Sequence, residues 1–325
     1  MIPTLRLLCG YLPTLPFFML NSCSPAPNIS PPSPLPLVRV RYPSVPPGLR
    51  WLRLKFKLLG VLAPELAFRA SWRVFTTPRR LPRRPWEAAA LAGARRSEVP
   101  VESGRVVAYE WNPTGARTVL LVHGWEHRAS FWGALARELV KAGYRVVALD
   151  GPAHGDSAGQ RATLISFAGA VQAVVDTLGC VHGVVAHSFG AACTAGVPVR
   201  FNAAAGGRLP RLVLMSVPSS TRRVAERFAS LLQLPDRVVA RMGEFIQQQY
   251  GRSAESFSLL ASGRHLPVDR ALLLHDRDDA HVPFTDAEEI AAHWPALILE
   301  PTTGLGHNRI LRDPAVARRI CAFLD

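Results

Sequence analysis

From residue 97 onward the chain alternates short apolar runs with helical patterns, and this order constrains the fold more than any other feature. Runs of Val, Leu and Ile bounded by turn residues occur at 118–124, 144–151, 181–188, 211–217, 271–276 and 296–301. Runs that are apolar throughout, rather than at every second residue, indicate strands buried on both faces. Helical periodicity between them, as over 130–144 and 167–179, completes repeated β-α-β units. The sequence therefore predicts an α/β domain over 97–325 with a mostly parallel central sheet flanked by helices.

Two segments of this domain depart from the alternation. Residues 98–102 and 105–111 form the pattern of a short hairpin around a Ser-Gly turn. A long interval then separates the strand ending near Val217 from the strand beginning at Ala271, and it holds two amphipathic patterns. We expect a small helical cap over about residues 219–268, at the carboxyl edge of the sheet, where open α/β sheets bind their ligands.

The N-terminal part differs in charge from the rest of the chain. The first 100 residues hold 15 Lys and Arg against 3 Asp and Glu, whereas the remaining 225 hold 23 against 21. The net charge of +14 is therefore a property of the N-terminal segment. Because the main domain is nearly neutral, we expect it to bind no nucleic acid.

Residues 1–47 carry 12 of the 28 prolines and predict a disordered, Pro-rich leader, a linker or an upstream-start extension rather than a packed element. An apolar stretch here has the length of a signal-peptide core, and Cys23 ends a loose lipoprotein cleavage pattern. Only one basic residue, Arg6, precedes that stretch, and Asn21 fits the cleavage pattern poorly. We therefore expect a cytoplasmic protein rather than an exported lipoprotein.

Residues 48–96 predict a basic, mostly helical segment. At helical spacing one face is basic and the opposite face is apolar: Arg50, Arg53 and Lys57 against Trp51, Leu54, Leu58 and Leu62. Such a helix can lie on an anionic membrane surface, which predicts peripheral membrane contact through 48–84. The alternative is a helix that docks its apolar face on the main domain, and the two-residue alternation of "LRLKFKLL" leaves a strand open as well.

The stretch "VVAHSFGAAC" at 184–193 joins a predicted strand to a predicted helix and centres on Ser188. Only small residues, Ala186 and Gly190, stand two positions away, as a sharp turn that lifts the hydroxyl above the sheet edge requires. This segment resembles the nucleophile motif of the alpha/beta hydrolase family, in its esterase- and lipase-like serine branch. The family motif G-x-S-x-G begins here with Ala in place of the first Gly.

The resemblance implies a catalytic triad in the order serine, acid, histidine, with each residue just after a strand. His307 lies in a Gly-flanked loop after the last predicted strand and is the expected base. The expected acid is Asp279, three residues before a Val-Pro pair, with Asp278 as the alternative.

The resemblance also implies an oxyanion hole, in which backbone N–H groups stabilise the charge that develops on the attacked carbonyl. The expected donors are the amides of Trp125 and Phe189. Gly124 allows the backbone to approach a ligand closely, and His123 is expected to support this loop by hydrogen bonding. The turn at 149–159 resembles the family's D-x-P-G-H-G-x-S turn and is expected to be structural.

These residues together predict a serine hydrolase that cleaves small carboxylic esters through an acyl-enzyme. No metal or organic cofactor is expected, and the five cysteines show no paired spacing that would indicate a zinc site or a disulfide framework. Fold and triad do not determine the substrate. A membrane-surface lipid hydrolase, a thioesterase and a non-catalytic small-molecule-binding protein therefore stay open as alternatives.

Overall fold

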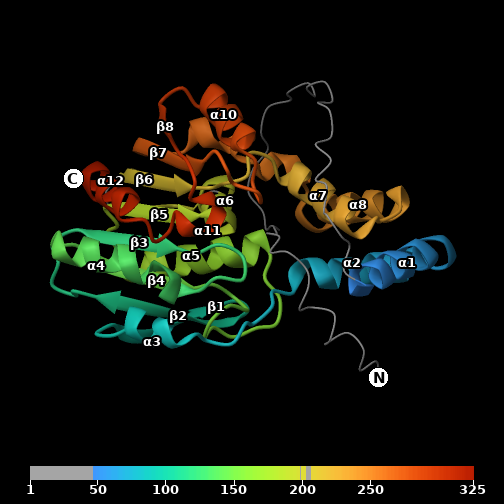
Figure 1. Cartoon of the computed structure of the whole chain (residues 1–325), viewed down its shortest axis with the longest axis horizontal. Helices are drawn as coiled ribbons and strands as arrows, with labels where there is room; N and C mark the ends of the chain where they lie inside the picture. The colour runs from blue at the N-terminus through green and yellow to red at the C-terminus, as the bar shows by residue number, and fades with distance from the viewer. Residues whose placement is uncertain (1–46, 198, 203–205) are drawn as a thin grey trace.

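The computed structural model describes residues 47–197, 199–202 and 206–325 (Figure 1). The predicted leader at 1–47 lies outside these ranges except for its last residue, so that prediction is not tested here.

A sheet that has eight strands in the described residues forms the centre of the molecule. The strands are β1 (Arg95–Val101), β2 (Gly104–Trp111), β3 (Thr118–Val122), β4 (Arg145–Asp150), β5 (Gly183–His187), β6 (Leu209–Met215), β7 (Val268–Asp276) and β8 (Leu297–Thr302). Their order across the sheet is β1-β2-β4-β3-β5-β6-β7-β8. The hairpin β1–β2 joins antiparallel to β4, and every pairing from β4 to β8 is parallel. The sheet is mostly parallel, as the sequence predicts.

Burial explains why these apolar runs are strands. Every residue of β3 and β5 is buried, because helices cover both faces of the sheet. Strands β6 and β7 begin two and three residues earlier than the apolar runs do. There Leu209 pairs with Val268 in register, so backbone hydrogen bonding extends both strands beyond their apolar cores.

Two hydrophobic cores lie on the two faces of the sheet. Along β3, Leu120 and Val122 belong to one core, whereas Val119 and Leu121 belong to the other. The first core is filled by α5 (Leu164–Leu178), α6 (Ser188–Gly196) and α10 (Phe284–His293); the second is filled by α4 (Gly133–Lys141) and α12 (Pro314–Leu324).

The N-terminal helices pack with the helices of the predicted cap. Helices α1 (Pro47–Leu62) and α2 (Pro64–Thr76) lie beside α7 (Thr221–Leu232) and α8 (Asp236–Tyr250), to one side of the sheet (Figure 1). Aromatic rings join α2 to the cap: Phe75 and Phe228 have centroids 4.4 Å apart. The rest of the cap is short, with η5 (Ala254–Phe257), α9 (Leu259–Ser262) and η6 (Gly263–His265). The four long helices form one layer, which we call the helical layer.

The segment predicted as helical over 48–96 is interrupted. Pro64 separates α1 from α2, and residues 77–84 are not helical before α3 (Pro85–Ala90) begins. Pro78 and Pro82 lie in that gap, where each lacks the N–H that a continuing helix needs. In the part of the chain that the structure describes, no helix has both the length and the apolar character needed to cross a bilayer.

Candidate active site

Ser188 lies at the junction of β5 and α6 in a backbone conformation that is rare for a residue with a side chain. Its φ is +50°, in the left-handed region, which costs about 1–2 kcal/mol for an L-residue. The turn also needs a glycine where α6 passes the end of β3. A Cβ on Gly190 would lie 2.3 Å from the carbonyl oxygen of His123, so a side chain does not fit there. Ala186, the departure from the family motif, is fully buried inside β5 and paired with Val122. The methyl group of Ala186 is therefore compatible with this turn.

His307 reaches Ser188 from the loop after β8, the strand at the end of the strand order, whereas Ser188 follows the central strand β5. It belongs to the single-turn helix α11 (Gly306–Arg309), just after β8. The Ser188 hydroxyl donates to Nε2 of His307 at 3.0 Å, and Nδ1–H of the same ring donates to Oδ2 of Asp279 at 2.7 Å. Residues separated by up to 119 positions thus form one hydrogen-bonded chain at the carboxyl edge of the sheet.

Asp279 is held by a turn that explains its spacing from the Val-Pro pair. Its Oδ1 accepts hydrogen bonds from the amides of His281 and Val282 at 2.8 and 2.9 Å, two and three residues further on. The side chain is fully buried. Burial alone would raise the pKa of Asp279, but the hydrogen bond and charge of His307 together with these amides hold it below its usual value. The carboxylate is therefore ionised beside the imidazole.

The other two aspartates of this loop have different partners. Asp278 accepts a hydrogen bond from the amide of Gly304 at 2.8 Å, and Asp276 accepts from the Thr302 hydroxyl at 2.7 Å. Both carboxylates tie the β7 loop to the β8 loop. Of the two candidates for the acid, the structure brings Asp279 to the imidazole and turns Asp278 to the loop backbone.

The predicted oxyanion loop follows β3 and lies against Ser188. A Cβ on Gly124 would be 2.8 Å from Nδ1 of His187 and 3.1 Å from Cβ of Ser188, so any side chain here would push these two residues away. Next to it, the Trp125 ring packs edge-on against Phe189, with centroids 5.0 Å apart. Buried His123 donates from Nδ1 to the carbonyl of Gly124 and accepts at Nε2 from the amide of Gly151. Burial lowers the pKa of His123 to about 4, so it acts as a neutral link between the loops after β3 and β4.

Comparison with known proteins decides the family. A model of the alpha/beta hydrolase family matches residues 119–319. The chain belongs to the alpha/beta hydrolase family. Among curated protein sequences, none matches it.

Solved structures share the fold of this hydrolase at low sequence identity. An esterase of Pyrococcus furiosus is 19% identical, with a TM-score of 0.56, over 76% of this chain and 95% of the esterase. A serine hydrolase of Cycloclasticus zankles is 17% identical, with a TM-score of 0.53, over 72% and 98%. A bacterial membrane phospholipase A is 20% identical, with a TM-score of 0.52, over 86% and 96%.

Sequence reasoning missed the part that His187 plays in this hydrolase. Its buried Nε2–H donates to the backbone carbonyl of His307 at 2.9 Å, and its ring lies 4.7 Å from the His307 ring. Burial and the neighbouring His307 lower the pKa of His187 well below its usual value, so it stays neutral. On the far side His127 stacks on His187 with a centroid distance of 5.4 Å. His187, at the second position of the motif, thus supports the backbone of the loop that carries His307, which the motif alone does not indicate.

An ion pair behind the oxyanion loop also escaped prediction. Arg79, from the stretch between α2 and α3, binds the carboxylate of Glu126 with nitrogen–oxygen distances down to 2.6 Å. Both side chains are largely buried, and Glu126 directly follows Trp125. Nearby, Arg80 donates to the carbonyls of Gly155 and Ser157. Arg79 and Arg80 contribute to the positive charge of the N-terminal segment. In the structure they bind the loops that follow β3 and β4.

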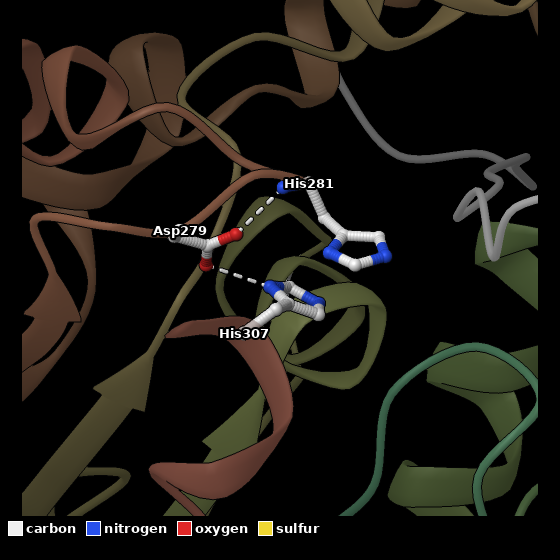
Figure 2. Close-up of side chains that lie close together, drawn as sticks. All are labelled: Asp279, His281 and His307. Atoms are coloured by element: carbon white, nitrogen blue, oxygen red, sulfur yellow. Dashed lines mark hydrogen bonds and ion pairs between the residues drawn. The ribbon is translucent and has the colours of Figure 1, made fainter. Parts of the chain in front are cut away.

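His281 lies beside His307, as Figure 2 shows, with ring centroids 5.0 Å apart. Asp279, His281 and His307 each offer a ligand atom, and these atoms lie within 4.8 Å of one another, a grouping that could hold a metal ion. In this structure Nδ1 of His307 is hydrogen-bonded to Oδ2 of Asp279 at 2.7 Å, so neither atom is free to bind an ion in this arrangement.

Proposed function

We propose that this chain is a serine hydrolase that cleaves carboxylic esters of small molecules. The observation that supports the proposal is the hydrogen-bonded chain from Asp279 through His307 to Ser188, at the sheet edge where α/β proteins carry out their chemistry. A serine hydroxyl alone is a weak nucleophile, and it needs a base and a group that orients that base. These three side chains fit the three roles.

In the proposed reaction Ser188 attacks the acyl carbonyl while His307 takes its proton. Asp279 holds the imidazole in the tautomer that accepts at Nε2 and stabilises the imidazolium that forms. The amides of Trp125 and Phe189 are the proposed donors to the oxyanion. His307 then protonates the leaving alcohol, and a water activated by the same imidazole hydrolyses the acyl-enzyme.

Carboxylic esters are the first substrate class to test. The structural neighbours of this chain are named as an esterase, a serine hydrolase and a membrane phospholipase A. Their low identity supports the shared fold, so acyl-chain length and leaving group need direct measurement. Thioesters fit the same attack on an acyl carbonyl and belong in the same substrate panel.

The test is covalent labelling of the folded protein with a fluorophosphonate probe, together with p-nitrophenyl ester hydrolysis. We expect Ser188→Ala to abolish both while leaving the circular dichroism spectrum unchanged. Ser216→Ala is the matched control: Ser216 ends the next strand with a φ of +49°, and its buried hydroxyl has no hydrogen-bond partner in the described residues. Labelling that persists in Ser188→Ala, or an unlabelled wild type that still binds small esters, would contradict the proposal. The second result would indicate a non-catalytic binding protein.

A further inference from the structure

The exposed apolar side chains of this protein gather on one helix. In the residues that the structure describes, eight large hydrophobic side chains are exposed, and six of them lie between residues 51 and 66. These six are Trp51, Leu54, Leu58, Val61, Leu62 and Leu66. The first five follow one face of α1 at spacings of three and four residues, and we call them the α1 stripe. Leu62 is 80% exposed and Trp51 is 69% exposed, so the residues that the structure describes cover little of the stripe.

The opposite face of α1 already packs on the helical layer. Leu49 and Phe56 are buried, and a Cβ on Gly60 would lie 2.4 Å from the Pro235 ring. Arg53 donates to the carbonyl of Leu231 at 2.8 Å. The α1 stripe is therefore a second apolar face, in addition to the one that holds the helix in place. The helix therefore docks on the rest of the protein, but it does so through Leu49 and Phe56 and leaves the face with Trp51 exposed.

Basic side chains border the α1 stripe. At 100° per residue, Lys55 lies along one edge of the stripe, and Arg50 and Lys57 lie along the other. All three side chains are exposed, and α1 contains no Asp or Glu. The first acid after it, Glu65, is paired with Arg69 at 3.1 Å and with Arg241 at 3.3 Å. The stripe is thus an apolar surface with cations on both sides.

We propose that the α1 stripe is a docking surface for anionic phospholipid bilayers. A helix that lies in the plane of a bilayer buries apolar side chains at the acyl boundary and places Lys and Arg at the head groups. Trp51 suits this position because its ring prefers the interface. A second copy of the chain fits less well, because symmetric pairing along the stripe would bring its basic borders together. The proposal concerns a surface away from the catalytic residues and does not rest on the proposed function.

The sequence places the possible membrane contact anywhere in residues 48–84, and we limit the proposed contact to α1. The arginines at 79 and 80 are bound to the active-site loops, and Arg83 pairs with Asp156 at 2.6 Å. Helix α2 offers no comparable stripe, because Leu66 is its one large exposed hydrophobic residue and Arg69 and Arg73 share the exposed face. The cap would therefore be held near the membrane through its contacts with α1.

The test is co-sedimentation of the full-length protein with vesicles. We expect binding to vesicles of three parts phosphatidylcholine and one part phosphatidylglycerol, and at least tenfold weaker partitioning into phosphatidylcholine alone or in 0.5 M salt. The triple variant Trp51→Ala, Leu58→Ser, Leu62→Ser should lower partitioning into the anionic vesicles at least tenfold, since it removes three of the large apolar side chains that would be buried at the acyl boundary. Its circular dichroism spectrum should match that of the wild type.

Matched controls keep the result specific to the stripe. Leu81→Ser and Ile298→Ser alter exposed hydrophobic residues elsewhere on the protein and should bind as the wild type does. Lys55→Gln with Lys57→Gln should weaken binding and reduce its dependence on salt, whereas Arg137→Gln on the exposed face of α4 should do neither.

Three results would overturn the proposal. One is a wild type that fails to bind the anionic vesicles, and another is a triple variant that binds them as well as the wild type. The third comes from light scattering: a wild-type dimer that the triple variant converts to a monomer, without vesicle binding by either, would make the α1 stripe a self-association surface.

Discussion

The carboxyl edge of the sheet and the α1 stripe use side chains in opposite ways. At the edge, Ser188 and Asp279 are buried, His307 is partly buried, and the three side chains are hydrogen-bonded to one another. On α1, Trp51 and Leu62 are apolar and face solvent. Buried polar side chains are stable only when they are hydrogen-bonded, and here the three side chains are partners of one another. That arrangement is the basis of the proposed chemistry. Contiguous exposed apolar surface is uncommon and often serves as an interaction site, which is the basis of the docking proposal for the second region.

The largest effect that we expect is at Asp279, the proposed acid of the triad. Asp279→Asn should reduce the kcat of ester hydrolysis by about 10³–10⁴-fold, because an amide does not hold the imidazole in the productive tautomer. Asp278→Asn is the matched control, since an amide oxygen can still accept the hydrogen bond from Gly304. Steady-state kinetics of both variants measure the difference, and equal losses would contradict the assignment.

The second-largest effect that we expect is on the free energy of unfolding, when substitutions on the two faces of α1 are compared. Phe56→Ala on the buried face should lower the free energy of unfolding by about 3 kcal/mol, through lost burial and the cavity that remains. Leu58→Ala, two residues away on the α1 stripe, should change it by less than about 0.5 kcal/mol. Urea unfolding of the two variants checks this. A large loss in Leu58→Ala would mean that the stripe is packed against protein.

A smaller effect concerns the buried histidines around the site. Folding lowers the pKa of His123 from 6.5 to about 4 because burial penalises its charged form. Below pH 6.5 His123 binds a proton in the unfolded chain but stays neutral in the folded chain. The free energy of unfolding therefore decreases as the pH falls. Between pH 7.5 and 5 the loss from His123 alone should be about 2 kcal/mol.

Urea unfolding at the two pH values measures this loss. His123→Gln has no imidazole to titrate at this position, so it should reduce the loss of stability between the two pH values by about this amount, although it lowers stability at both values. Stability of the wild type that is unchanged from pH 7.5 to 5 would contradict the expectation. The stripe, which contains no titrating group, should contribute nothing to the slope.

Much of the fold could be predicted because its signals are local. A run such as 118–122 can be buried on both faces only in a covered sheet, and β3 forms there. The spacing of Asp279 from Val282 is also local, because a turn that uses both amides sets it. The meeting of Ser188 with His307 could be expected only from the family's order of residues. The roles given to these side chains stay predictions until the labelling and kinetics are done.

What the sequence by itself determined is the order of strands and helices, the tight turn at Ser188 and the two-faced character of residues 50–62. Those properties depend on side-chain size and periodicity over a few residues. Only the tertiary structure decided that Arg79 holds Glu126, that His187 supports the His307 backbone, and that α1 buries Phe56 while Leu58 stays exposed. Each of these depends on which segments, distant along the chain, fold against one another, and periodicity along a single segment carries no information about that partner.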